Sequence, residues 1–137
     1  MDARKFLYPE RRRGAIAHPD RARQLINFEG LNFGTITPTD LDGLIDYHNQ
    51  QFAFLEIKSA GVPLLYGQQT AFERIVDRIE MSGARAALFF AHHTVRDCDQ
   101  QIDAARTLVI AFYESRRWSS FPGIWTLRQA LDGWFHF

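Results

Sequence analysis

The sequence is poor in cysteine, in lysine and in long apolar runs, and each shortage narrows what the protein can be. Cys98 is the only cysteine, so the chain can form no internal disulfide and offers no cysteine framework for structural zinc. The longest apolar runs, at 86–91 and 108–113, are far shorter than the roughly 20 residues that a membrane-spanning helix needs. The basic start lacks the apolar segment of a secretory signal. We therefore expect no membrane partner and a cytoplasmic protein of a prokaryote or a phage-infected host.

The composition is that of a globular chain. With 137 residues, 46% of them hydrophobic and 23% charged, the chain is long enough for one core and too short for two ordinary domains. No repeat or Ser/Gly linker divides it. We expect a single domain over residues 1–137.

The net charge of zero hides an asymmetry along the chain. Residues 1–25 carry seven Arg or Lys against three acids, a net charge of +4, and the remainder is acidic by the same amount. A basic arm over 1–19 suits contacts to the phosphates of a polyanion, with Arg11, Arg12 and Arg13 as the candidate contacts. A solvated N-terminal segment is the alternative interpretation.

The spacing of apolar residues and turn formers predicts a mixed α/β order. A helix is expected at 21–28, a hairpin of strands 41–47 and 52–58 around a turn at 48–50, and a short strand at 63–66. A helix from 67 to about 82, buried strands at 86–91 and 107–113, a loop or short helix at 97–105 and a last helix at 126–134 follow. This order points to a mixed central sheet flanked by helices.

The predicted hairpin brings together charges that a buried strand does not normally carry. Side chains alternate along a strand, so Glu56 and Lys58 share one face. The fold of the hairpin leaves Asp42 near the end of its strand, where it can approach Glu56 if the two strands splay apart. Carboxylate oxygens are the ligands that Mg²⁺ prefers, and a lysine beside them can stabilise charge on a phosphate. A Glu56–Lys58 ion pair at the strand end is the purely structural alternative.

The pattern Asp42, 13 residues, then Glu56-Ile57-Lys58 resembles the PD-(D/E)XK superfamily of restriction-endonuclease-like nucleases, which includes the small Holliday-junction resolvases and the VRR-type nucleases. The resemblance implies an αβββαβ core over 20–93, with a C-terminal β/α extension over 94–137. It implies Mg²⁺ or Mn²⁺ bound by Asp42, Glu56 and the backbone carbonyl of Ile57, and Lys58 assisting the nucleophile. It also implies a catalytic Gln at the start of the following helix, for which we favour Gln68.

Two further acids compete for the same roles. Asp40 is an alternative ligand to Asp42, because Pro38 precedes Asp42 by four residues rather than standing next to it as in the family pattern. Glu29 is the candidate for the acid that many members carry on their first helix. His92 and His93 follow a buried strand without the spacing of a metal site, and one of them can reach the rim of the candidate site.

The resemblance implies a metal-dependent phosphodiesterase, a nuclease that acts on nucleic acid and most readily on DNA, and we expect a homodimer because so small a domain reaches only one strand. One alternative is a catalytically inactive module of the same fold that binds nucleic acid or protein, for example in a small phage or mobile-element protein. Another is a structural oligomer built through the aromatic C-terminus. The tryptophans there suit base stacking or, more often, a core or interface; they are Trp118, Trp125 and Trp134.

Overall fold

The computed structural model describes residues 25–136, which belong to two separate units. The first unit ends at Pro38 and the second begins at Thr39. As far as it is described, the first unit contains the 3-10 helix η2 (Glu29–Leu31) and a β-bridge between Phe33 and Ile36. The second unit holds all the strands and α-helices of the described chain.

The helix predicted at 21–28 is wrong for the half that is described, because residues 25–28 are not helical. The side chain of Asn27 accepts a hydrogen bond from the backbone N–H of Glu29 at 2.9 Å. Such local side-chain contacts of Asn compete with helix formation. Outside the described residues lie 21–24 and the predicted phosphate contacts Arg11, Arg12 and Arg13.

The second unit is built on one mixed, five-stranded sheet with the strand order β1-β2-β3-β4-β5. Its strands are β1 (Gly43–Tyr47), β2 (Gln51–Ser59), β3 (Arg85–His93), β4 (Leu108–Glu114) and β5 (Arg117–Ser119). β2 and β3 run parallel, and every other neighbouring pair is antiparallel. The predicted mixed α/β class is confirmed, as are the strands expected at the positions of β1 to β4.

The hairpin of β1 and β2 turns at the predicted place. His48 and Asn49 have φ angles of 55° and 59°, the left-handed conformation that tight hairpin turns use and that Asn tolerates well. Asp46 stabilises the turn, since its carboxylate accepts the backbone N–H of Asn49 at 2.7 Å. The register that follows pairs Gly43 with Leu55 and thereby decides what stands at the open end of the hairpin.

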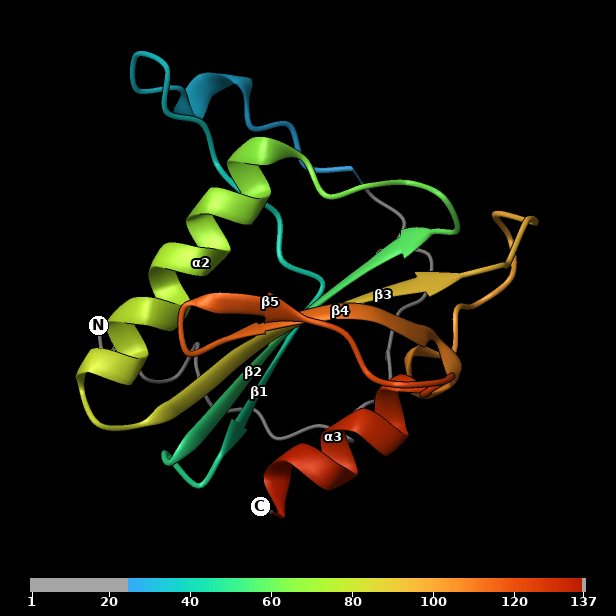
Figure 1. Ribbon diagram of the computed structural model, residues 1–137. Helices are drawn as coiled ribbons and strands as arrows, with labels where there is room; N and C mark the ends of the chain where they lie inside the picture. The colour runs from blue at the N-terminus through green and yellow to red at the C-terminus, as the bar shows by residue number, and fades with distance from the viewer. Residues whose placement is uncertain (1–24, 137) are drawn as a thin grey trace, which may run out of the picture. The chain divides into compact units, whose positions relative to one another are not determined.

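Two helices cover opposite faces of the sheet (Figure 1). Helix α2 (Tyr66–Met81) is the crossover between the parallel strands β2 and β3, and its Phe72 and Val76 pack with Phe54 of β2. Helix α3 (Leu127–Phe135) begins with a capping box formed by Thr126 and Gln129. Its buried side chains form a second cluster with alternate residues of β2 and β3: Leu127, Ala130, Leu131 and Trp134 against Ala53, Ala87 and Phe89.

The C-terminal aromatic residues belong mainly to this core. Trp134 is 6% exposed, and its ring contacts Phe89 edge to face with centroids 5.6 Å apart. Trp118 packs against the buried cluster under α2, whereas 36% of the surface of Trp125 is exposed to solvent. Core packing therefore accounts for Trp118 and Trp134 without any stacked base.

Two details of the sheet differ from the prediction. The strand expected at 63–66 is wrong: Pro63 lacks a backbone N–H for strand pairing, and the chain passes through a loop into α2 at Tyr66. Strand β5 was not expected, since its three residues are too short to show a period; it forms because Ser115 and Arg116 make a tight turn with positive φ.

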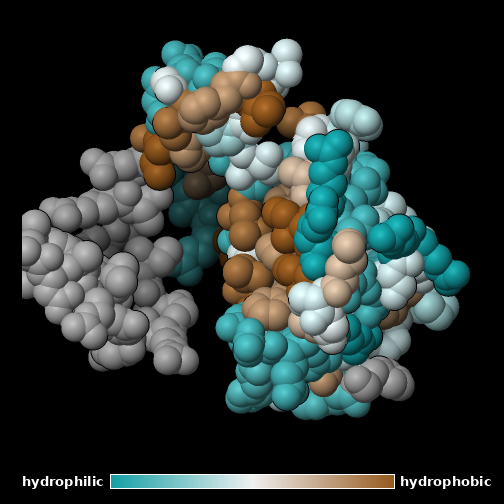
Figure 2. All heavy atoms as spheres, turned by 90° about the vertical axis from the view of Figure 1, so that its left-hand side faces the viewer, coloured by the Kyte–Doolittle hydropathy of each residue, from teal (hydrophilic) through white to brown (hydrophobic). Residues whose placement is uncertain are grey.

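The surface on the α2 side is not uniformly polar. Seen from that side, hydrophobic side chains gather in one area that hydrophilic side chains border (Figure 2). Large apolar side chains that the second unit exposes include Leu44 on β1 and Ile75 on α2. The predicted homodimer stays a prediction.

Within residues 25–136, no helix combines the length and the hydropathy that crossing a membrane demands.

Candidate active site

The open end of the β1–β2 hairpin brings the predicted acids together. Asp42 lies directly before β1, and the hairpin register continued by one residue sets it opposite Glu56. Its Oδ2 accepts a hydrogen bond of 2.7 Å from the backbone N–H of Ile57. This bond ties Asp42 to the end of β2, where the pattern of alternate residues alone left its position open. Asp40 is exposed and has no hydrogen-bond or salt-bridge partner among the described residues.

Glu56 is the most deeply buried charged residue of the site. It follows Phe54 on the sheet face that α2 covers, and it is 2% exposed. Its Oε1 receives two long polar contacts, from Lys58 Nζ at 3.5 Å and from Gln68 Nε2 at 3.4 Å. Its Oε2 is buried and has no hydrogen-bond partner.

Gln68 comes from the first turn of α2 and closes the site from above the sheet. Tyr66 is the first residue of the helix, so Gln68 stands at its third position and reaches Glu56 across the β2–α2 connection. Its own Oε1 is also buried without a hydrogen-bond partner. The sequence singled out Gln68, but only the packing reveals that an acceptor on Gln68 and another on Glu56 are both left unpaired.

The electrostatics of the site favour an additional positive charge. Burial raises the pKa of Glu56 above its ordinary value, the neighbouring Asp42 carboxylate raises it further, and Lys58 partly offsets both. Because unpaired buried carboxylate oxygens are costly, a cation between Asp42 and Glu56 would lower the free energy of this arrangement.

Lys58 lies two residues beyond Glu56 on β2 and therefore on the same face, and 23% of its side chain is exposed. In the parallel register of β2 and β3 its neighbour is His92, which therefore faces the same side. The Nε2 of His92 lies 3.1 Å from the carbonyl oxygen of Val62, which can only accept, so Nε2 carries the proton. His93 points to the other face, and its Nδ1 accepts from the backbone N–H of Val95.

The carboxylates of the site suit the oxygen-binding cation that the resemblance implies. Within the described residues no group of three or more His, Cys, Asp or Glu side chains gathers closely enough to hold a metal ion by itself. Mg²⁺ does not require such a group, because it binds through one or two carboxylates and retains water or phosphate oxygens. The unpaired Oε2 of Glu56 beside Asp42 fits that requirement. Ile57 stands between the two charged residues, and its carbonyl stays a predicted ligand.

Four of the predicted residues precede the second unit, which carries this site. Glu29 lies in η2 of the first unit. The three arginines of the N-terminal arm lie outside the described residues.

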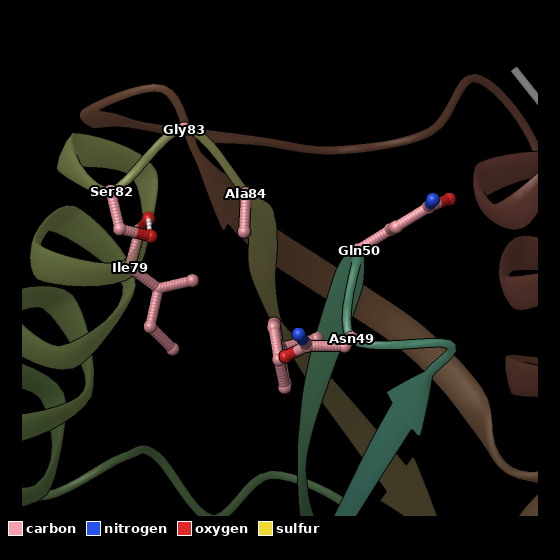
Figure 3. Close-up of a pocket in the computed structure, with 7 residues that line it drawn as sticks. Asn49, Gln50, Ile79, Ser82, Gly83 and Ala84 are labelled. Atoms are coloured by element: carbon pink, nitrogen blue, oxygen red, sulfur yellow. Dashed lines mark hydrogen bonds between the residues drawn. The ribbon is translucent and has the colours of Figure 1, made fainter.

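The hollow drawn in Figure 3 lies at the opposite end of the sheet. It has a volume of about 520 Å³ and is lined by the hairpin turn, the end of α2 and the start of β3. Asn49, Gln50 and Ser82 supply its polar side chains, and no charged residue lines it. It contributes nothing to the cluster of Asp42, Glu56, Lys58 and Gln68.

Comparison with protein-family models, with curated proteins and with solved structures found no match.

Proposed function

We propose that this protein is a metal-dependent nuclease of the PD-(D/E)XK type, which hydrolyses phosphodiester bonds in nucleic acid, with DNA as the expected substrate. The observation that carries the proposal is the pairing of Glu56 with Asp42: a carboxylate that is 2% exposed retains an unpaired oxygen next to a second carboxylate. A charge cluster that served only the fold would be expected to satisfy its buried acceptors.

The arrangement of elements supports the same proposal. In the superfamily the Asp ends one strand and the E-x-K motif lies on the next. Here Asp42 borders β1, and Glu56 and Lys58 lie on β2. Helix α2 then connects β2 to the parallel strand β3. The αβββαβ core remains a proposal, because neither its first helix nor a third strand before α2 is present among the described residues.

In this mechanism Asp42, Glu56 and the carbonyl of Ile57 would hold Mg²⁺ or Mn²⁺. When bound, such a cation supplies Lewis-acid stabilisation of the phosphate oxygens and of the charge that develops on them. Asp42 is already oriented for this task, because its other oxygen, Oδ2, is fixed by the Ile57 amide. Glu56 is held by Lys58 and Gln68 through Oε1, and its Oε2 has no partner among the described residues, so Glu56 would be free to serve as a ligand.

Lys58 acts on the reacting groups themselves. Its partly exposed ammonium donates hydrogen bonds to the attacking water or to a non-bridging phosphate oxygen, where negative charge grows as the water oxygen bonds to phosphorus. The water releases its proton to solvent, and the ester oxygen leaves with the bonding electron pair and takes up a proton from solvent. Gln68 orients Glu56 through its amide N–H and offers its unpaired Oε1 as an acceptor for the same water.

The test compares wild-type protein with Asp42→Asn and Lys58→Ala on supercoiled plasmid and on a labelled single strand, in Mg²⁺, in Mn²⁺ and in EDTA. Asp77→Asn is the matched control, because it neutralises a carboxylate of α2 that already has its partner. We expect cutting by wild type and by the control only with metal, and a loss of about a hundredfold to a thousandfold in each site variant. Equal cutting by folded wild type and Lys58→Ala would refute the mechanism.

The Glu56–Lys58 pair also favours a second candidate, a module that binds nucleic acid without cutting it. An ion pair at 3.5 Å already neutralises part of the cluster without any metal. On this reading no substrate is cut in either metal, and the protein retains salt-dependent affinity for nucleic acid in EDTA. The predicted homodimer and the contacts from Arg11, Arg12 and Arg13 belong equally to both candidates.

A further inference from the structure

The described chain forms a hollow of about 640 Å³ beside the candidate active site, at the end of β3 that carries His92. Its volume is within the range of pockets that take a small organic molecule. His92 lines it, and the same residue is the β3 neighbour of Lys58 on the shared face of the sheet. The backbones of His92 and Lys58 are about one strand spacing apart, roughly 5 Å, so the hollow begins beside the reactive end of β2.

The wall of the hollow next to Lys58 is held in place. His92 contacts the ring of Phe90 edge to face at 5.0 Å, and its Nε2 donates to the carbonyl of Val62. The imidazole is thus held by one ring contact and one hydrogen bond.

The floor of the hollow is apolar and its borders are charged. Ile102, Leu108 and Ile110 line it and keep 40–44% of their exposure. Arg106 lines one border, and Asp103, whose carboxylate accepts the backbone N–H of Ala105, lines it as well. An apolar floor suits a flat ring, a guanidinium suits a phosphate, and a carboxylate accepts hydrogen bonds from ring amino groups.

We propose that this hollow receives the base of the nucleotide next to the phosphate that is cut, so that the protein acts on nucleic acid with an unpaired nucleotide at that position. A paired base is stacked within a duplex and cannot enter a pocket unless it is extruded, which costs free energy that a single strand does not require. The inference rests on the proposed nuclease function and adds to it a substrate class: single strands, ends and unpaired sites in preference to continuous duplex.

The cleavage test uses one labelled DNA oligonucleotide, either single-stranded or annealed to its complement, in Mn²⁺. Ile110→Asn removes apolar floor, and Ile75→Asn is the control, because both isoleucines are exposed to nearly the same extent, 44% and 42%, and Ile75 lies on α2 away from the hollow. We expect wild type and Ile75→Asn to cut the single strand about tenfold faster than the duplex, and Ile110→Asn to lose that preference. Ile102→Asn repeats the test outside the strands.

A binding test separates this inference from the proposed function. Fluorescence anisotropy with the same two oligonucleotides in EDTA measures their binding to the protein without any cutting. We expect tighter binding of the single strand by wild type, weakened about tenfold in Ile110→Asn and in Arg106→Ala. Cutting without a preference for the single strand overturns the proposed role of the hollow and leaves the proposed nuclease function. Preferential binding without cutting overturns the nuclease proposal and leaves the hollow only as a binding site for an unpaired base. No preference in either test overturns the hollow.

Discussion

Helix α2 carries carboxylates along its length and covers another near its N-terminal end, and the fold supplies hydrogen-bond donors to them differently. Of its own acids, Glu73 accepts the indole N–H of Trp118 at 2.8 Å, and Asp77 accepts the hydroxyl of Tyr113 at 2.8 Å. These acids hold the β4–β5 edge of the sheet against the helix. Each has a neutral donor supplied by the fold, so neither requires a ligand.

Near its N-terminal end, α2 covers Glu56, for which the fold supplies too few hydrogen-bond donors. Lys58 and Gln68 both contact Oε1 of Glu56. Oε2 of Glu56 and the amide oxygen of Gln68 are buried without hydrogen-bond partners. The contrast within one helix teaches how a structural carboxylate differs from one that awaits a ligand: the first is saturated by the fold, and the second is buried beside another acid and left unsaturated.

The largest effect on stability is expected from removing a hydrogen-bond donor that the fold supplies to a carboxylate. Tyr113→Phe removes the donor to Asp77, and we expect it to lower the free energy of unfolding by about 1.5 kcal/mol, because hydrogen bonds to charged groups exceed the usual contribution. Urea denaturation measures the loss. Cleavage by the folded variant should match wild type, and a parallel loss of activity would show that the two ends of α2 are not independent.

The same pair predicts a pH dependence. Burial, with the hydrogen bond to Asp77, raises the pKa of Tyr113 from 10.0 to about 12. The raised pKa means that the stabilisation is fully present below pH 10 and is lost as the pH rises toward about 12, since the unfolded chain ionises first. The difference in stability between wild type and Tyr113→Phe should shrink over that interval, and a constant difference would count against the assignment.

A smaller effect of the opposite sign is expected at the unsaturated end. Glu56→Gln removes a buried charge, and we expect it to raise the free energy of unfolding in EDTA at pH 7 by about 1 kcal/mol, as functional sites commonly cost stability. Mg²⁺ should raise the melting temperature of wild type and leave that of Glu56→Gln unchanged. Destabilisation by Glu56→Gln in EDTA would favour the purely structural ion pair with Lys58.

The sign of the pH effect at Glu56 follows from its raised pKa. A carboxyl whose folded pKa lies above its ordinary value of 4.5 is protonated more readily in the folded state, so its contribution to stability is present at low pH and falls as the pH rises past that value. Wild type without metal should therefore lose stability relative to Glu56→Gln as the pH rises from about 4.5. Thermal unfolding in EDTA at several pH values measures this difference.

The smallest effect is expected at Glu80, the most C-terminal acid of α2. It accepts the backbone N–H of Ser115 at 3.1 Å in an exposed turn, where water can replace it. We expect Glu80→Gln to change the free energy of unfolding by less than about 0.5 kcal/mol. A loss as large as that of Tyr113→Phe would mean that the turn between β4 and β5 depends on this contact.

Local patterns predicted much of the sheet and most of the candidate site. Alternation along β2 put Glu56 and Lys58 on one face, and the turn at His48 and Asn49 set the hairpin. The pattern failed where no period exists: Leu25 and Ile26 suggested a helix but are exposed, at 98% and 75%. A few apolar residues without a surface to pack against do not stabilise a short helix.

The sequence by itself determined which residue types stand near one another, because strand alternation and turn chemistry act over a few residues. It set Asp42 and Glu56 at the open end of one hairpin and Gln68 at the start of the next helix. Only the tertiary structure decided which of these groups are saturated. The burial of Glu56 and the unpaired oxygens depend on how α2 packs across β2, and the closeness of His92 to Lys58 depends on pairing between strands that lie far apart in the chain.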